Sequence, residues 1–352
     1  MPHATRGYAA TSPTSPLAPF TFSRRDVRPD DVRIEILFAG ICHSDLHQAR
    51  DDWGGAAYPM VPGHEILGRV VEVGANVTRF RVGDVAAVGC MVDSCRECGS
   101  CKDDLEQYCE RGATWTYNGR ERDGSGATQG GYSDQIVVTE RFVVKVPASM
   151  DLRAVAPLLC AGITTYSPLH HWKVGPGQRV GIIGLGGLGH MGVKLAKAMG
   201  AEVTMITTSP GKGEDARRLG ADAVLLSTDR ARMNAAKRSF DFLLNTIPVG
   251  HDIAPYLTLL GRDRTMVLVG ALTELEPAFR GNLLMQGRRS LAGSSIGGMA
   301  ETQQMIDFCA AHDVVSDVEI IAIQQVNEAY ERLLKNDVRY RFVIDMASLK
   351  KS

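Results

Sequence analysis

The chain has 352 residues, which is long for a single hydrophobic core and predicts two domains. Its formal net charge of -1 argues against nucleic acid or an anionic membrane as a partner. Hydrophobic residues make up 44% of the chain, but no apolar run approaches the ~20 residues of a membrane helix. The opening "MPHATRGYAATSPTSPLAPF" lacks a basic head followed by an apolar core, so we expect no signal peptide and a cytoplasmic protein with reduced cysteines.

The first part of the chain reads as mostly β. Its apolar residues alternate or run continuously with β-branched content, and Gly, Asn or Pro separate the runs. The predicted strands are residues 32–38, 66–73, 84–89 and 135–146.

Five of the eight cysteines lie between residues 90 and 109. Four of them, Cys95, Cys98, Cys101 and Cys109, follow the spacing C-x2-C-x2-C-x7-C, which suits four thiolates around one structural zinc ion. An iron–sulfur cluster also takes four thiolates, and free thiols are the third reading. Cys90 ends an apolar strand outside this spacing, so we expect a free buried cysteine there.

From about residue 151 the pattern of apolar residues changes, and short apolar strands alternate with helical stretches. This pattern predicts βα units and a parallel sheet with helices on both faces. The strands are expected at "RVGIIG", "EVTMIT", "AVLL", "FDFLLNT" and "RTMVLVG", with helices at "LGHMGVKLAKAMG" and "GEDARRLG". The tail predicts helices over 301–315 and 324–336 and a final strand over 340–345.

The first βα turn holds a glycine motif. Gly184, Gly186 and Gly189 form G-x-G-x-x-G between a strand and a helix. The glycines allow a tight turn, a close approach of backbone to a pyrophosphate, and close packing of the helix on the strand. The motif alone is weak, but its place at the start of a βα series predicts a dinucleotide site.

The end of the second strand indicates which dinucleotide binds. An NAD site places an acid there, on the ribose 2′-hydroxyl. Here Thr207, Thr208 and Ser209 follow the strand and Lys212 comes next, which suits a 2′-phosphate. We therefore expect NADP(H) rather than NAD(H), the alternative being an ordinary polar turn.

Further metal-ligating residue types are scattered. Cys42 follows a strand, His64 and Glu65 stand in "PMVPGHEILG", and Cys160 stands in "APLLCAGITTY". Two thiolates, one imidazole and an open position would make a catalytic zinc site. From the residues alone, a lone cysteine such as Cys160 is more often part of the core than a metal ligand. A histidine followed by a glutamate, as at His64 and Glu65, is more often a polar surface pair.

The chain resembles the zinc-containing medium-chain dehydrogenase/reductase superfamily, in its cinnamyl alcohol dehydrogenase branch, and especially the broad-specificity NADP-dependent aldehyde reductases. The stretch from Gly63 to Val77 fits the family pattern G-H-E-x2-G-x5-G-x2-V. The motifs "CHSDLH", "GGYSDQIVV", "APLLCAGITTYSPL", "GLGGLGHMGVK", "LVGA", "GSSIGG" and "YRFVID" follow in the family's order over nearly the whole chain.

The resemblance implies roles for the residues of the catalytic centre. Cys42, His64 and Cys160 match the catalytic zinc ligands, and the C-x2-C cluster matches the structural zinc lobe. Glu65 matches a carboxylate that approaches the ion when water leaves, and Asp45 one that orients the zinc-bound imidazole. Ser44 matches the hydroxyl that is hydrogen-bonded to the substrate oxygen. His47 matches the outer end of a proton relay.

The resemblance also implies cofactor and substrate contacts. The cofactor residues are Thr164, Gly184, Gly186, Gly187, Leu188, Gly189, Thr208, Ser209, Lys212, Gly270, Ser295, Ile296 and Arg341. The pocket walls are Trp53, Met60, Trp115 and Ile296. Ser295 stands where many plant members carry Phe, which puts aromatic packing on a phenylpropenal in doubt.

The expected fold is α/β, with a mostly β GroES-like catalytic domain over 1–150, a doubly wound Rossmann domain over 151–297 and a return to the catalytic domain over 298–352. The resemblance implies a homodimeric NADP-dependent alcohol dehydrogenase or aldehyde reductase that binds two zinc ions per chain and acts on small aldehydes or alcohols. The alternatives are a cinnamyl-alcohol-type enzyme with a narrower aromatic range, a zinc-independent quinone or enoyl reductase, and a non-enzymatic binding protein.

Overall fold

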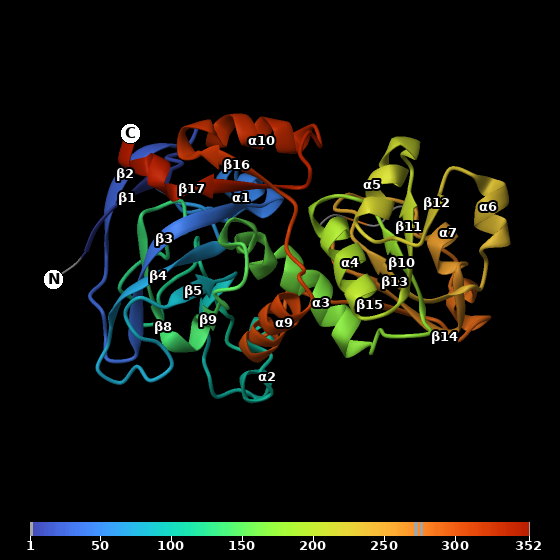
Figure 1. Cartoon of the computed structure of the whole chain (residues 1–352), viewed down its shortest axis with the longest axis horizontal. Coiled ribbons are helices and arrows are strands. Elements are labelled where there is room, and N and C mark those ends of the chain that lie inside the picture. The colour runs from blue at the N-terminus through green and yellow to red at the C-terminus, as the bar shows by residue number, and fades with distance from the viewer. Residues whose placement is uncertain (1–2, 271–273, 275–276, 352) are drawn as a thin grey trace. The chain divides into compact units, whose positions relative to one another are not determined.

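The computed structural model describes residues 3–270, 274 and 277–351, and the chain divides into two compact units. The first unit comprises Met1–Cys160 and Gly297–Ser352, and the second comprises Ala161–Ile296. The chain leaves the first unit once and returns to it, as the colours of Figure 1 allow the reader to follow. Among the described residues there is no helix whose length and apolar character would let it cross a membrane.

A seven-stranded sheet forms the frame of the first unit. Its order is β16-β17-β3-β4-β5-β9, and β8 also pairs with β3. The strands are β3 (Asp31–Ile41), β4 (Ile66–Val73), β5 (Val85–Val88), β8 (Gln135–Thr139), β9 (Val144–Lys145), β16 (Val318–Ala322) and β17 (Arg341–Asp345). The long strand β3 pairs with β4, β8 and β17, so its end holds the next residue, Cys42, at a well-determined point.

Smaller elements complete this unit. Two two-stranded sheets pair β1 (His3–Ala9) with β2 (Ala18–Arg24) and β6 (Met91–Asp93) with β7 (Thr114–Trp115). The helices are α1 (His43–Ala49), α2 (Gly99–Lys102), α9 (Met299–Ala311) and α10 (Val326–Leu334). Sequence analysis missed β1, β2, β6, β7 and β16.

The single strand predicted over 135–146 is wrong, because the structure has two strands there. A 3-10 turn at Glu140–Phe142 separates β8 from β9. The two strands pair with different partners, β3 and β5, so the chain has to change direction between them. The Glu140 carboxylate accepts hydrogen bonds from the N–H groups of Thr78 and Arg79, and these bonds hold the turn in place.

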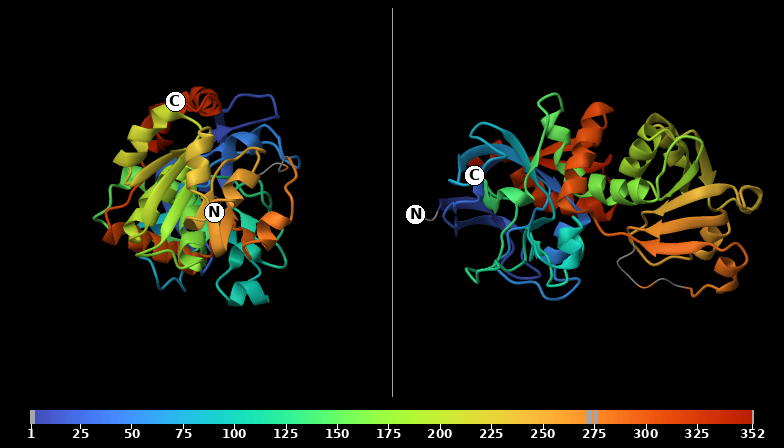
Figure 2. Two further views of the ribbon diagram at one scale, coloured as in Figure 1. Left: turned by 90° about the vertical axis from the view of Figure 1, so that its right-hand side faces the viewer. Right: turned by 90° about the horizontal axis from the view of Figure 1, so that it is seen from below.

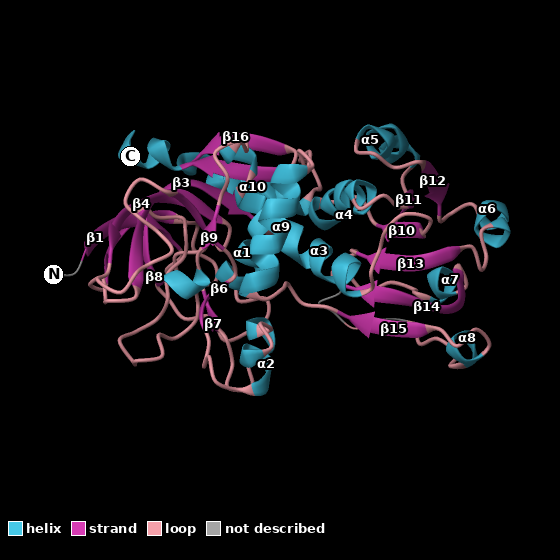
Figure 3. Ribbon diagram, turned by 60° about the horizontal axis from the view of Figure 1, so that its bottom comes forward, coloured by secondary structure: helices cyan, strands magenta, loops and turns pink. Residues whose placement is uncertain are grey.

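The second unit is built on a six-stranded parallel sheet of order β12-β11-β10-β13-β14-β15 (Figures 2 and 3). Counted along this unit, the order is 3-2-1-4-5-6, that of a doubly wound dinucleotide-binding fold. The strands are β10 (Arg179–Ile183), β11 (Glu202–Thr207), β12 (Ala223–Leu226), β13 (Phe240–Asn245), β14 (Leu260–Leu268) and β15 (Ser290–Gly293). The predicted run of βα units is confirmed, while β15 was missed.

The helices of this unit are α3 (Ala161–His171), α4 (Gly187–Ala198), α5 (Gly213–Arg218), α6 (Arg230–Ala235), α7 (Ala254–Leu257) and α8 (Asn282–Met285). Its core contains a hydrophobic cluster that includes Ile183, Ile206 and Leu243, all fully buried. The strand order reverses between β10 and β13, and the ends of these two strands are where such folds bind their ligands.

Candidate functional site

A buried donor set assembles in the first unit from three distant parts of the chain. Cys42 follows β3, His64 and Glu65 precede β4, and Cys160 ends a 3-10 turn at Ala156–Leu159. One ligand atom from each of the four lies within 4.8 Å of the others, and all four are buried. The Sγ atoms of Cys42 and Cys160 are 3.9 Å apart. Two thiolates on one tetrahedral zinc ion stand about 3.8 Å apart, so the set fits zinc.

Asp45 is the centre of the hydrogen bonds behind this set. Its fully buried carboxylate lies 2.9 Å from His64 Nδ1. It also accepts hydrogen bonds from the N–H groups of Cys42 and Gly63 and from the Tyr132 hydroxyl. Because Nδ1 is engaged, Nε2 is the nitrogen available to an ion, which is the arrangement expected behind a metal-bound histidine.

Without an ion, the charges around the set favour the thiolate of Cys42 and the protonated forms of His64 and Cys160. Burial opposes the charged form of His64, yet the Asp45 carboxylate raises its pKa well above the usual value. The hydrogen bond with Cys160, with help from the positive charges of Arg341 and His64, lowers the pKa of Cys42 well below that of a free thiol despite burial. A bound cation would take the place of the protons that these groups otherwise share.

Glu65 pairs with Arg341 beside the donor set. The Arg341 guanidinium donates to Oε1 of Glu65, and both side chains are buried. Burial raises the pKa of Glu65 to about 7 although Arg341 opposes this shift. Oε2 of Glu65 is buried without a hydrogen-bond partner, and an unpaired buried oxygen of this kind is a natural ligand for a cation. Sequence analysis assigned Arg341 to the cofactor and did not foresee this pair.

The two residues expected to move the proton lie on α1. The Ser44 hydroxyl is 3.6 Å from Cys42 Sγ, next to the donor set. His47 is partly exposed, with Nδ1 2.7 Å from the Asp52 carboxylate and its ring 5.5 Å from that of Trp53. Ser44 therefore lies near the buried metal ligands, and His47 reaches towards water.

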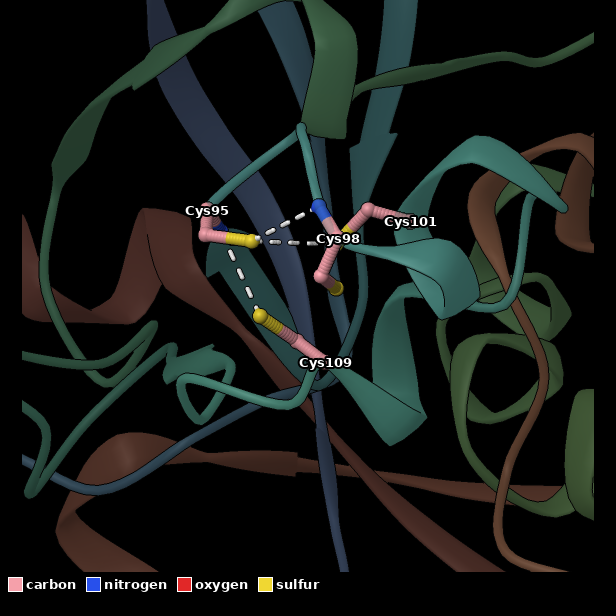
Figure 4. A group of neighbouring side chains, drawn as sticks. All are labelled: Cys95, Cys98, Cys101 and Cys109. Atoms are coloured by element: carbon pink, nitrogen blue, oxygen red, sulfur yellow. Dashed lines mark hydrogen bonds between the residues drawn. The ribbon is translucent and has the colours of Figure 1, made fainter.

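The second donor set is the cysteine lobe, defined here as residues 95–109. Figure 4 shows its four cysteine side chains gathered around one point. Their Sγ atoms lie within 4.8 Å of one another, and those of Cys95 and Cys101 are 3.8 Å apart. The N–H of Cys98 donates to Cys95 Sγ and that of Cys95 to Cys109 Sγ, each at 3.4 Å. This geometry fits a closed tetrahedral site in which four thiolates take all four positions around one ion.

The thiols of the lobe differ in acidity. Hydrogen bonds from the amides of Glu97 and Cys98 lower the pKa of Cys95 to about 6. Burial raises the pKa of Cys101 to about 12. A bound divalent cation would be needed to keep all the sulfurs as thiolates at neutral pH.

The lobe is attached to the start of α9. Oε2 of Glu106 accepts a hydrogen bond from the Met299 N–H, at the helix N-terminus. Gly298 lies so close to the lobe that a Cβ there would overlap the Asp104 carbonyl oxygen and stand 2.8 Å from Glu106 Oε2. A glycine is therefore required where the returning chain meets the lobe.

We expect Gly298→Ala to lower the melting temperature by several degrees, because overpacking of this kind costs ~1–3 kcal/mol. Gly281→Ala is the matched control, since its new Cβ would meet nothing within 4 Å. Differential scanning calorimetry of both variants measures the effect. Equal melting temperatures in the two variants would show that the attachment of the lobe is not tight.

The glycine motif of the second unit has the predicted shape. Gly184 directly follows β10 and has a φ of 92°. Gly189 in α4 packs against it so closely that a Cβ on Gly189 would overlap the Gly184 carbonyl oxygen. The Thr246 hydroxyl, at the end of β13, donates to the carbonyl oxygens of Ile183 and Gly184. Gly186 has open space where a Cβ would be, as close approach of a ligand requires. Gly187 and Leu188 begin α4.

The residues expected at the 2′-phosphate follow β11. Thr208 is exposed and Ser209 half-buried, and Ser209 precedes a 3-10 turn that ends at Lys212. Nζ of Lys212 lies 2.8 Å from the Leu185 carbonyl oxygen, inside the glycine motif. The lysine is thus held beside the turn that would take the pyrophosphate.

The other predicted contacts are dispersed. In the second unit Thr164 is buried in α3, Gly270 follows β14, Ser295 is exposed, and Ile296 has a φ of 38°. In the first unit Met60 is 1% exposed, whereas Trp53 and Trp115 are each 44% exposed. Nothing in the geometry of either unit by itself assigns these residues to a cofactor or a substrate.

Three residues near the site carried no role in the sequence reasoning. Tyr132 bonds to Asp45, and the Tyr117 ring lies 5.9 Å from that of His64. Thr246 closes the glycine turn. Tyr132 stands in the motif "GGYSDQIVV" and Thr246 at the end of a predicted strand, so their positions were visible although their partners were not.

Two parts of the chain match known families. Residues 28–148 match the alcohol dehydrogenase GroES-like domain, and residues 187–311 match the zinc-binding dehydrogenases.

Individual proteins are similar over nearly the whole chain. The aldehyde reductase YahK of Escherichia coli (strain K12) is 54% identical over 346 residues, which cover 98% of this chain and 99% of that protein. A cinnamyl alcohol dehydrogenase structure from Sorghum bicolor has a TM-score of 0.94 at 48% identity and covers 98% of both chains. The structure of CAD from Helicobacter pylori complexed with NADP(H) has a TM-score of 0.91 at 42% identity and covers 99% of both chains.

Proposed function

Because the chain belongs to the zinc-binding dehydrogenases and carries their alcohol dehydrogenase GroES-like domain, we propose that it transfers hydride between NADP(H) and aldehydes or primary alcohols, chiefly as a broad-specificity aldehyde reductase. The observation that carries the proposal is the buried set of Cys42, His64 and Cys160 with Asp45 behind the imidazole. A zinc-independent reductase on this fold would have no use for these three ligands together.

Cys42, His64 and Cys160 would hold the catalytic zinc ion, and the lobe would hold a second, structural one. When bound, the catalytic ion supplies Lewis-acid polarisation of a carbonyl oxygen. Asp45 keeps His64 in the tautomer that leaves Nε2 free. Glu65 keeps one oxygen on Arg341 and the other unpaired beside the ligands.

Ser44 and His47 would carry the proton. The Ser44 hydroxyl lies next to the donor set, and His47, on the same helix, is partly exposed and paired with Asp52. A proton taken from water at His47 would pass inward to the hydroxyl of Ser44 and then to the substrate oxygen. The ring contact with Trp53 helps to hold His47 in place for this role.

The glycine turn after β10 would bind the dinucleotide, whose nicotinamide supplies the hydride. NADP(H) is favoured because no acid follows β11 and Lys212 is held at the turn. The presence of NADP(H) in the similar structure from Helicobacter pylori supports the same choice. Thr208, Ser209 and Lys212 would contact the 2′-phosphate, and Thr164, Gly270, Ser295 and Ile296 the rest of the cofactor.

We expect Lys212→Ala to raise the KM for NADPH by roughly tenfold and to change that for NADH little. A hydrogen bond between charged groups is worth ~1.5–3 kcal/mol, and ~1.4 kcal/mol is tenfold in affinity. Salt reduces the effect, so initial rates are measured at low ionic strength. The exposed Lys237, on the same unit, provides the control Lys237→Ala. Equal use of NADH and NADPH by the unaltered protein would contradict this assignment.

A single assay tests the proposed function. The purified protein should contain about two zinc ions per chain and oxidise NADPH only when an aldehyde is added. A panel of aliphatic and aromatic aldehydes then separates a broad range from a narrow aromatic one. Loss of NADPH absorbance with none of them, in protein that carries its zinc, would contradict the proposal.

We also propose a cytoplasmic homodimer. All eight cysteines are free, and seven of them lie in or beside the two donor sets, which need a reducing compartment to remain thiolates. The dimer rests on the family resemblance and is tested by sedimentation equilibrium.

A further inference from the structure

A glycine in the middle of the first unit leaves room for the Glu65 carboxylate. Gly40 lies near the end of β3. A Cβ at this position would overlap Oε2 of Glu65 and stand 2.9 Å from its Cβ and 3.0 Å from its Cδ. Real Cβ atoms essentially never approach other heavy atoms this closely, so no other residue fits while Glu65 keeps its present position.

The backbone prevents the two residues from moving apart. The N–H of Gly40 donates to the carbonyl oxygen of Glu65 at 2.8 Å. On its other side, Gly40 pairs with Val343 of β17. Both neighbours of Gly40, Ala39 and Ile41, are fully buried, so the strand has no space into which it could shift.

The carboxylate is equally constrained. Residues 341 and 343 of β17 lie on the same face of the sheet, so Arg341 stands on the face that Gly40 leaves open. The Arg341 guanidinium holds Oε1, and the unpaired Oε2 fills the space above Gly40. One oxygen of this carboxylate lies within 4.8 Å of the ligand atoms of Cys42, His64 and Cys160.

We propose that Gly40 is a positioning residue for Glu65. Because Gly40 has no side chain, the Glu65 carboxylate can stand beside the metal ligands. The carboxylate in this position determines how firmly the catalytic ion is held. An alanine takes the place of Oε2, so the carboxylate turns away from its position beside the ligands. The inference rests on the proposed function, because it assumes zinc at Cys42, His64 and Cys160.

The experiment is a double-mutant cycle with zinc release as the readout. The unaltered protein, Gly40→Ala, Glu65→Ala and the double variant are each mixed with a chromophoric chelator, and the release of the first zinc equivalent is timed. We expect Gly40→Ala to speed this release roughly tenfold, the lower end of what loss of a group that supports a metal ligand costs. In the Glu65→Ala background the same substitution should add little, because the overlapping carboxylate is gone.

Gly281→Ala is the control and should release zinc at the original rate. If Gly40→Ala does not fold but the double variant does, the overlap with Glu65 is demonstrated directly. The proposal is overturned if Gly40→Ala releases zinc like the unaltered protein, or if the effects of Gly40→Ala and Glu65→Ala on the release rate simply multiply in the double variant. An unaltered protein that holds no zinc would instead contradict the proposed function.

Discussion

Replacing His64 by alanine should abolish aldehyde reduction in a protein that still folds. A catalytic zinc ion contributes several kcal/mol to the stability of the transition state, and ~1.4 kcal/mol is tenfold in rate. We therefore expect kcat/KM to fall by a factor of a thousand or more. The zinc content should fall from about two to about one per chain. Cys42→Ala should behave in the same way, because it removes a ligand of the same set.

The fold should survive because the frame around His64 does not depend on its imidazole. Asp45 keeps the hydrogen bonds from Cys42 N–H, Gly63 N–H and the Tyr132 hydroxyl. Cys309→Ala is the matched control, since it removes a fully buried thiol of the same unit that belongs to neither donor set. Circular dichroism establishes folding, and a well-folded His64→Ala variant with near-normal activity would refute the assignment.

Replacing Cys98 by serine should lower stability before it affects chemistry. The lobe contains one turn of helix, α2, and a short 3-10 turn, and its cysteines lie among exposed polar residues. Structural zinc contributes folding energy outright in such segments. We expect the loss of one zinc ion per chain and a fall in melting temperature on the order of 10 °C, equivalent to several kcal/mol for a chain of this size.

The fall should extend beyond the lobe itself, because Glu106 and Gly298 attach the lobe to the start of α9. Cys101→Ser should have the same effect, whereas Cys309→Ala again serves as control. Calorimetry and metal analysis measure both quantities, and kcat at low temperature should remain close to the original. An unchanged zinc content together with an unchanged melting temperature in Cys98→Ser would disprove the structural role of the lobe.

Features that depend on neighbouring residues could be predicted from the sequence. The four cysteines of the lobe lie within fifteen residues, so short turns are sufficient to gather them. The glycine motif likewise acts through one turn, where Gly184 has the φ of 92° that only glycine adopts readily. The alternation of short apolar strands with helical stretches from residue 151 predicted the parallel sheet of the second unit. Each strand and each helix shows its own hydrophobic pattern within a few residues, so the signal is local.

The tertiary structure alone decided which distant residues meet. Cys42 and Cys160 come to 3.9 Å, and Asp45 collects donors from three segments, although no local pattern links them. The family resemblance named several of these residues, but it did not reveal the pairing of Glu65 with Arg341 or the space above Gly40. Both depend on the register of β3 against β17, in which Gly40 faces Val343. A shift of one residue would turn Arg341 to the opposite face, and such a register is set by packing across the whole sheet rather than by either strand alone.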